Sequence, residues 1–93
     1  MEFEWDPQKA AKNLSKHKVS FTEAATVFDD PLSVTVADPD HLVEEDRFII
    51  VGQSYRRNLL IVSFAERGDR IRIISARELT RTGRRAYEDG IYD

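Results

Sequence analysis

Hydrophobic and polar residues alternate with a period of two along several stretches of this 93-residue chain. Such alternation, with many β-branched and aromatic residues, predicts half-buried β-strands. The strands are expected at about residues 2–5, 32–36, 47–53, 59–65 and 70–76. The segments between the last three, residues 54–58 and 66–69, have the length and the turn residues of hairpin loops. These strands are therefore expected to be antiparallel neighbours.

The first helix is expected to begin at Asp6, which can cap a helix N-terminus, with Pro7 as the first helical residue. It would end near Ser15. Helical spacing predicts which side chains face the core and which face solvent. Those expected to face inward are Ala10, Ala11 and Leu14, and those expected to face outward are Lys9, Lys12 and Asn13.

A second helix is expected after Ser20, because Ser20 and Glu23 have the spacing of a capping box. Its apolar stripe at i, i+3, i+4 and i+7 consists of Phe21, Ala24, Ala25 and Phe28. Two aspartates and a proline at 29–31 would end this helix. A last helix is expected at about residues 78–89.

The resulting order is β-α-α-β-β-β-β-α. Consecutive strands flanked by helices favour an α+β fold, an antiparallel sheet meander with the helices packed on one face. The chain length suits one domain, here residues 1–93.

Charge is divided unevenly between the two halves of the chain. Residues 1–46 carry four lysines against eleven acidic residues, a net charge of −7. Residues 47–93 carry ten arginines against six acidic residues, a net charge of +4. An acidic protein with an arginine-rich second half is expected to have a localised anion-binding face.

The composition argues against several classes of protein. The chain has no cysteine, so it has neither a disulfide framework nor a thiolate metal site. It also lacks a Gly-rich phosphate loop, a nucleophile elbow and a cluster of metal ligands, so no metal and no cofactor are expected. The N-terminus does not resemble a secretory signal and no apolar run approaches the ~20 residues of a membrane span, so a cytoplasmic protein is expected.

Arg77 is the strongest candidate for anion binding. A strict period of two along the strand would place it on the same face as Ile71 and Ile73, partly desolvated and in need of an acidic partner. That partner could be internal, such as Glu23 or Glu45, in a structural salt bridge. Alternatively it could be a phosphate, whose geometry suits the guanidinium fork.

The last helix carries Arg81, Arg84 and Arg85 on one side, with Tyr87 close to them. These residues could form a simple solvated face. They could also follow an RNA backbone, with Tyr87 stacking on a base.

Lys16 and His17 follow the first helix. Cations at a helix C-terminus favour the helix dipole, which would be a purely structural role. His17 is also suited to proton transfer near neutral pH. His41, in an acidic loop, could be a second proton-transfer group, but it is interpreted as a loop residue without a role.

The acidic run at 44–46 leads into Arg47. It could be a solvated charge run, or Glu45 could act as a general base beside Arg47. The absence of a phosphate loop, a nucleophile elbow and a metal-ligand cluster is compatible with metal-free RNA cleavage, in which a base activates the 2′-hydroxyl and Arg or Lys stabilises the phosphorane.

Taken together, these motifs resemble the BrnT family, the toxins of bacterial type II toxin–antitoxin pairs. The resemblance runs in the family's order over nearly the whole chain. It is carried by Phe3-Glu-Trp-Asp-Pro-Gln-Lys9, Asn13-Leu-Ser-Lys-His17, Val19-Ser-Phe-Thr-Glu-Ala24, Val27-Phe-Asp-Asp-Pro31, Glu44-Glu45 with Arg47, Ile74-Ser-Ala-Arg77 and Arg84-Arg-Ala-Tyr-Glu88.

The resemblance implies a RelE-like fold and a metal-independent endoribonuclease that inhibits translation by cutting RNA. It implies a BrnA-like antitoxin with a ribbon–helix–helix domain. The toxin would reach operator DNA only through this antitoxin, and no membrane partner is expected. The residues that match functional positions in the family are Lys16, His17, Arg77, Arg81 and Tyr87, with Glu45 and Arg47 in a more variable segment.

The chain departs from the family at two positions. Lys18 stands where the family usually has Gly, which would matter if the backbone there needs a positive φ. Gly83 stands where the family usually has Glu, which removes a carboxylate from the last helix. An alternative hypothesis is therefore a catalytically weakened homologue that binds the antitoxin and regulates the operon. A structural or assembly protein is a third class.

Overall fold

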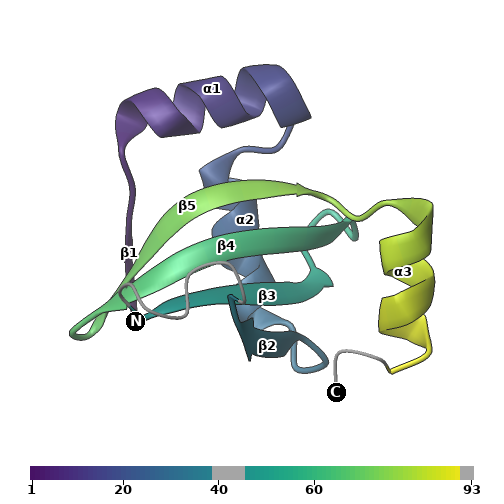
Figure 1. Ribbon diagram of the computed structural model, residues 1–93. Helices are drawn as coiled ribbons and strands as arrows, with labels where there is room; N and C mark the ends of the chain where they lie inside the picture. The colour runs from purple at the N-terminus through teal and green to yellow at the C-terminus, as the bar shows by residue number, and fades with distance from the viewer. Residues whose placement is uncertain (39–45, 91–93) are drawn as a thin grey trace.

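The computed structural model describes residues 1–38 and 46–90, and its strands form one mixed sheet in the order β1-β5-β4-β3-β2 (Figure 1). Along the chain the elements are β1 (Glu2–Glu4), α1 (Pro7–His17), α2 (Phe21–Thr26), the 3₁₀ turn η1 (Val27–Asp29), β2 (Val34–Ala37), β3 (Arg47–Gln53), β4 (Leu59–Arg67), β5 (Arg70–Glu78) and α3 (Arg81–Glu88). This is an α+β architecture.

Strands β2 to β5 form the predicted antiparallel meander, and β3 to β5 are joined by the two hairpin-length loops. The prediction of a wholly antiparallel sheet is wrong, because β1 pairs with β5 in parallel, from Glu2 opposite Arg70 to Glu4 opposite Arg72. Everything between β1 and β5 acts as one long crossover, which is the connection that a parallel pair requires. β1 is short, so beyond Arg72 this edge of β5 has no strand partner within residues 1–38 and 46–90.

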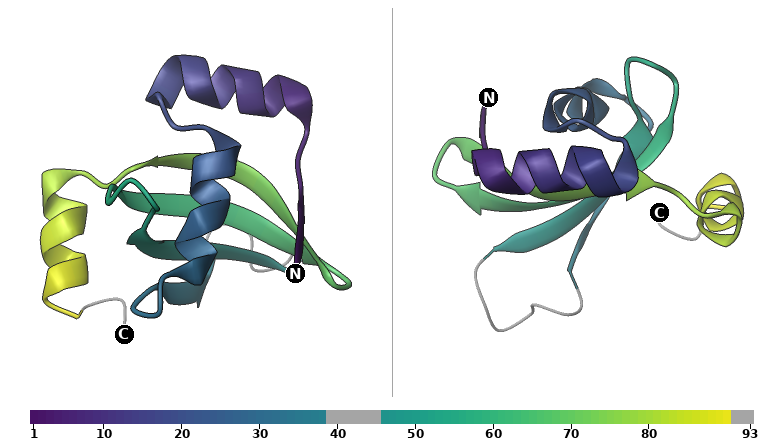
Figure 2. Two further views of the ribbon diagram at one scale, coloured as in Figure 1. Left: turned by 180° about the vertical axis from the view of Figure 1, so that it is seen from behind. Right: turned by 90° about the horizontal axis from the view of Figure 1, so that it is seen from above.

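Helix α2 and turn η1 cross one face of the sheet and form the hydrophobic core with it (Figure 2). Of the predicted apolar stripe, Phe21 and Ala24 are buried, and Ala25 and Phe28 are partly buried against the core. The ring of Phe28 meets that of Phe64 edge to face, with centroids 4.9 Å apart, a favourable aromatic geometry.

Helix α1 lies along β5 and is attached to it through Asn13. The prediction that Asn13 faces solvent and Leu14 faces the core is wrong: Asn13 is 6% exposed and Leu14 is 50% exposed. The Asn13 side-chain amide donates to the Ala76 carbonyl at 2.8 Å and to the Val19 carbonyl at 2.9 Å, and its oxygen accepts the Ala76 N–H at 3.0 Å. A polar side chain faces inward here because it satisfies backbone groups on the free edge of β5.

Both predicted helix N-caps are confirmed. The Asp6 carboxylate accepts the Gln8 N–H at 2.8 Å, and the Ser20 hydroxyl accepts the Glu23 N–H at 3.0 Å. The Glu23 carboxylate does not return to Ser20 as a full capping box requires. It accepts hydrogen bonds from Ser54 and Asn58, in the β3–β4 loop.

Helix α3 begins at Arg81, later than predicted, because β5 continues to Glu78 and Thr80 caps the helix. The expectation that all helices pack on one face is wrong for α3. It stands beyond the end of the strands, away from α2, and has no buried residue (Figures 1 and 2). The Tyr87 hydroxyl donates to the Leu32 carbonyl at 2.9 Å and ties α3 to the segment before β2.

We predict that Asn13→Ala lowers the free energy of unfolding by about 2–3 kcal/mol, because it leaves buried backbone groups of Val19 and Ala76 without partners. Urea denaturation measures the change. Lys12→Ala, an exposed site on the same helix, is the control and should stay within about 0.5 kcal/mol of the parent. An equally small effect at Asn13 would contradict the role assigned to its amide.

We also predict that Lys18→Gly stabilises the protein. Lys18 ends α1 in the left-handed conformation, with φ 61°, where a Cβ atom is strained and glycine is not. The gain should be about 0.5–1 kcal/mol by thermal unfolding. Lys18→Ala, which removes the same charge but keeps the Cβ atom, should show no such gain.

Candidate functional site

A β-bulge in β5 decides which way Arg77 points. Ser75 lies opposite Ser63 of β4, but the next β4 residue, Phe64, lies opposite Ile73, so Ile74 is an extra residue in β5. The bulge reverses the alternation of side chains along the strand. The prediction that Arg77 shares a face with Ile71 and Ile73 is therefore wrong. Those isoleucines belong to the core, and Arg77 is exposed on the opposite face.

Three arginines share this opposite face of the sheet, which we call the arginine face: Arg47, Arg72 and Arg77. Arg47 and Arg72 lie opposite Ala65 of β4, on its two sides, and Arg77 lies opposite Ile61. Ala65 and Ile61 are four residues apart on one strand, so Arg77 is about 13 Å along the sheet from the other two.

The glutamates of β1 pair with the arginines at the start of β5. Arg72 Nη1 lies 3.0 Å from Glu4 Oε2, and Arg70 lies 3.5 Å from both Glu2 and Glu4. The hydrogen bond from Arg72, with a smaller contribution from Arg70, lowers the pKa of Glu4 below its usual value against the opposing effect of desolvation. These two arginines already have acidic partners.

Arg77 lies beyond the reach of β1 and forms no ion pair within residues 1–38 and 46–90. Of the two internal partners proposed for it, Glu23 is buried on the α2 side and bonded to Ser54 and Asn58. Glu45 lies outside the described residues. Arg77 is therefore an exposed guanidinium that can bind an external anion.

Lys16 and His17 form the last turn of α1 rather than a joint after it. His17 is half-buried and Lys16 is exposed, and a hollow of about 240 Å³ between α1 and the bulge of β5 is lined by Lys9, Lys12, Asn13, Lys16, His17 and Ile74. His17 is one helical turn after Asn13. The hydrogen bonds of Asn13 to Ala76 thus hold this basic turn beside the strand residue that precedes Arg77.

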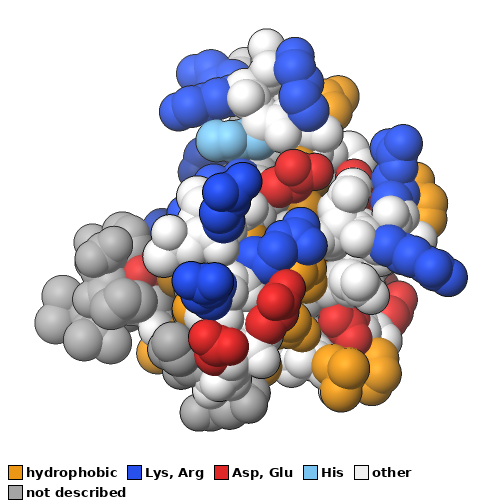
Figure 3. Space-filling view, turned by 90° about the vertical axis from the view of Figure 1, so that its right-hand side faces the viewer, with side chains coloured by type: hydrophobic (Ala, Val, Ile, Leu, Met, Phe, Trp, Pro, Cys, Tyr) orange, Lys and Arg blue, Asp and Glu red, His pale blue; other side chains and the backbone are white. Residues whose placement is uncertain are grey.

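Figure 3 looks on to the end of the molecule where α1 ends and α3 stands. Lys and Arg side chains are spread over this end, with a few acidic side chains between them. The α3 arginines predicted for RNA binding, Arg81, Arg84 and Arg85, are all exposed. Tyr87 is half-buried, and its hydroxyl donates to the Leu32 carbonyl, so this side chain anchors α3 to the segment before β2.

Arg47 begins β3, and its Nε atom is buried without a hydrogen-bond partner among the described residues. Its strand position separates it from Arg77, so the two do not form one tight cluster. His41, Glu44 and Glu45 lie outside the described residues. The base proposed at Glu45 therefore stays a prediction.

Within the described part of the chain, no group of three or more His, Asp or Glu could hold a metal ion. No helix there is long and apolar enough to cross a membrane.

Sequence reasoning missed Asn13, Lys9 and Lys12 as members of this region. Asn13 could have been noticed in the sequence, because it lies one helical turn before Lys16 and His17 and is an uncharged amide residue among exposed lysines. Its partner Ala76 is 63 residues away in the chain, so no local pattern could reveal the contact.

Comparison with known proteins identifies a matching family and a similar fold. The model of a family described as "Ribonuclease toxin, BrnT, of type II toxin-antitoxin system" matches residues 5–82. The fold is similar to the 1.1 Å crystal structure of the Brucella abortus ribonuclease toxin, BrnT, with a TM-score of 0.64 and 21% identity over 87% of this chain and 99% of that one. No curated protein matches the sequence.

The lowered pKa of Glu4 gives a pH-dependent prediction. Folding favours the ionised carboxylate, so its stabilisation is present above the usual value of 4.5 and is lost as the pH falls through the lowered pKa. Glu4→Gln should therefore lower the melting temperature at pH 7 and have little effect in strong acid. Glu2→Gln, whose carboxylate is mostly exposed, should show a smaller pH-dependent difference. A Glu4→Gln deficit that is the same at all pH values would contradict this ion pair.

Proposed function

Because the chain belongs to the BrnT family of ribonuclease toxins of type II toxin–antitoxin systems, we propose that it is a metal-independent endoribonuclease. It would act in the cytoplasm as a single toxin domain of RelE-like fold and inhibit translation by cutting RNA. An antitoxin partner and an RNA substrate follow from the family itself.

One observation carries the proposal: Arg77 has no acidic partner in the described structure and lies directly after Ala76, which Asn13 holds against the turn of Lys16 and His17. A free guanidinium, an ammonium and an imidazole at one end of a sheet are the groups that RNA cleavage without a metal requires.

The reaction can be written with these groups. A base takes the proton of the 2′-hydroxyl, and the 2′ oxygen attacks the adjacent phosphorus. The bond from phosphorus to the 5′ oxygen breaks, the leaving oxygen takes a proton, and the products are a 2′,3′-cyclic phosphate and a 5′-hydroxyl. We assign proton transfer to His17 and stabilisation of the negative phosphorane to Lys16 and Arg77.

Glu45 with Arg47 is a second candidate for proton transfer, because the two residues match a segment of the family. The Nε atom of Arg47 is buried without a hydrogen-bond partner among the described residues, so one of its donors is unused there.

The exposed arginines of α3, Arg81, Arg84 and Arg85, would bind the phosphates that flank the cleavage site. Tyr87 would contribute through its ring, since its hydroxyl already bonds to Leu32.

The antitoxin we propose is BrnA-like, with a ribbon–helix–helix domain that binds operator DNA. It would cover the basic end of the toxin with acidic or apolar residues, because complementary charge gives fast and specific association.

The alternative, a weakened homologue that only binds its antitoxin, depends mainly on Gly83. The Gly83 N–H donates to the capping hydroxyl of Thr80 at 3.0 Å. A glutamate at this position would complete a capping box. The glutamate that the family usually has at position 83 would therefore have a structural role as a helix cap. Its replacement by Gly83 does not by itself remove a catalytic group.

We predict that the purified protein cleaves RNA in the presence of EDTA. His17→Ala and Arg77→Ala should each reduce the single-turnover rate by about 10²-fold or more, the usual contribution of one acid–base or charge-stabilising group. Arg70→Ala removes the same charge at the far end of β5, where Arg70 pairs with Glu2 and Glu4, and should leave the rate within about threefold.

Folded protein that leaves RNA intact, both free and on ribosomes, would contradict the ribonuclease proposal. Expression without antitoxin distinguishes the two functions: an active toxin arrests growth, whereas a module that only binds antitoxin does not.

A further inference from the structure

We propose that the β3–β4 hairpin loop is a second RNA-binding element, in which Tyr55 stacks on an unpaired base and Arg56 and Arg57 bind the neighbouring phosphates. The inference rests on the proposed ribonuclease function and identifies a contact of the substrate outside the cleavage site.

The loop is held in place by a buried carboxylate. Glu23 is 4% exposed, and its Oε2 atom accepts the Ser54 hydroxyl at 2.7 Å and the Asn58 amide at 3.0 Å. Burying a carboxylate is costly unless it is hydrogen-bonded, so this pair of contacts fixes both ends of the loop on α2. The Thr26 hydroxyl also accepts the Tyr55 N–H, at 2.9 Å.

The three residues between these anchors all face solvent. Tyr55 is 69% exposed, and both arginines are exposed and form no ion pair with any described residue. Arg57 takes a left-handed conformation with φ 65°, a strain that the anchored loop maintains. An aromatic ring followed in the chain by two guanidinium groups, on a loop anchored at both ends, is suited to binding a nucleic-acid strand, because little freedom is lost on binding.

A hollow of about 310 Å³ beside the ring leaves space for a base. Its lining consists of Thr26, Asp29, Asp30, Gln53, Ser54 and Tyr55. Both oxygens of Asp30 already accept backbone N–H groups, from Leu32 and Gln53. The acidic lining repels phosphates, so the strand would place a base here and keep its backbone on the side of the arginines.

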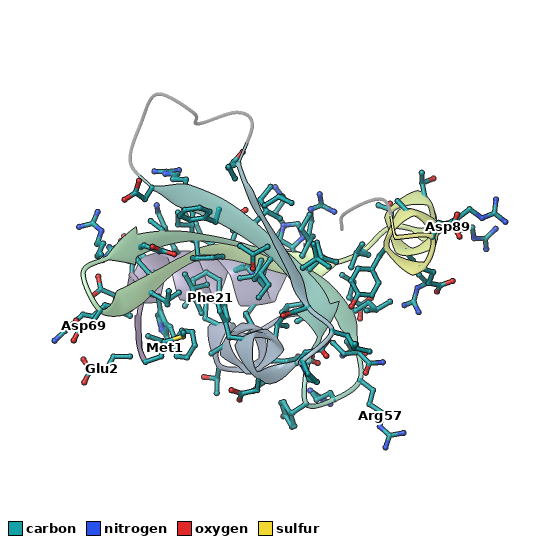
Figure 4. The ribbon with its side chains drawn as sticks, turned by 90° about the horizontal axis from the view of Figure 1, so that it is seen from below. Met1, Glu2, Phe21, Arg57, Asp69 and Asp89 are labelled. Atoms are coloured by element: carbon teal, nitrogen blue, oxygen red, sulfur yellow. The ribbon has the colours of Figure 1, made fainter. Side chains whose placement is uncertain are left out.

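The loop lies at the same end of the sheet as the candidate cleavage site. It leads directly into Leu59, whose carbonyl accepts the Leu79 N–H, and Ile61 lies opposite Arg77. Figure 4 shows Arg57 extending away from the body on the side of α3, at the opposite end of the molecule from Asp69. A single strand could therefore span from Arg77 to the loop. A duplex could not stack a base on Tyr55, because its bases are already paired and stacked.

Binding of a non-cleavable probe tests this inference separately from catalysis. The probe is a fluorescein-labelled 2′-O-methyl oligoadenylate of about 12 nucleotides, followed by anisotropy over a range of salt concentrations. Tyr55→Ala should weaken binding about fivefold or more, the lower range for loss of a stacking ring, while Tyr55→Phe should bind like the parent.

The double variant Arg56→Ala/Arg57→Asn should flatten the dependence of log K on log salt by about 0.7 for each phosphate that the loop no longer neutralises. Asn is used at position 57 because it tolerates a positive φ. Arg67→Ala, in the β4–β5 hairpin at the other end of the sheet, removes one charge away from the loop and is the control, which should leave the slope unchanged.

The parent and the Tyr55 variants are also assayed for cleavage. A parent that cleaves and binds RNA while the loop variants bind equally well overturns the loop assignment alone, and points to a different use of the loop such as antitoxin contact. A parent that neither binds nor cleaves RNA overturns the proposed function and this inference together.

Discussion

The side-chain amide of Asn13 occupies the place of a missing strand, and the candidate site depends on it. β1 pairs with β5 only as far as Arg72, so beyond that point the described chain offers this edge of β5 no further strand. Asn13 both donates to and accepts from Ala76, as a neighbouring strand would, and also donates to the Val19 carbonyl in the turn before the next helix. One buried amide therefore fixes α1, the turn after it and the end of β5 relative to one another. A strand in this place would have covered the edge that now faces Lys16 and His17.

The bulge at Ile74 completes this arrangement. Without it, residue 77 would point toward α2, where a guanidinium would be desolvated. With it, Ala76 takes the buried position and Arg77 the exposed one. An extra residue in a strand usually redirects a side chain, and here it turns a position that simple alternation assigns to the core into a surface cation. Asn13 binds the backbone of Ala76, and the bulge redirects the side chain of the next residue, Arg77. The two features therefore act on neighbouring residues.

Local patterns predicted those parts of the fold that depend on local interactions. The caps at Asp6 and Ser20, the hairpins and the extent of β3 were all visible in short windows of sequence, because capping and alternation involve residues close in the chain. The parallel pairing of β1 and the burial of Asn13 were not, since their partners lie in β5, which for Asn13 is 63 residues away. The bulge depends on the register between β4 and β5, which alternation within one strand does not reveal. The loop at Tyr55 was predicted as a hairpin turn, but its attachment to Glu23 only became apparent from the packing of α2.

The short length of β1 also explains how an acidic chain can present a basic end. Its glutamates neutralise Arg70 and Arg72, whereas Arg77, the arginines of α3 and those of the β3–β4 loop have no acidic partner among the described residues. At physiological ionic strength charges are screened over about 8 Å, whereas the described part of the molecule extends 32 Å in its longest direction. A phosphate near Arg77 therefore responds to the local arginines and hardly to the net charge of −3. A longer β1 would have covered the edge that Asn13 binds and extended its acidic side chains toward Arg77. Because β1 is short, the edge of β5 at Ala76 stays open for the attachment of α1, and the next residue, Arg77, stays without an acidic partner among the described residues.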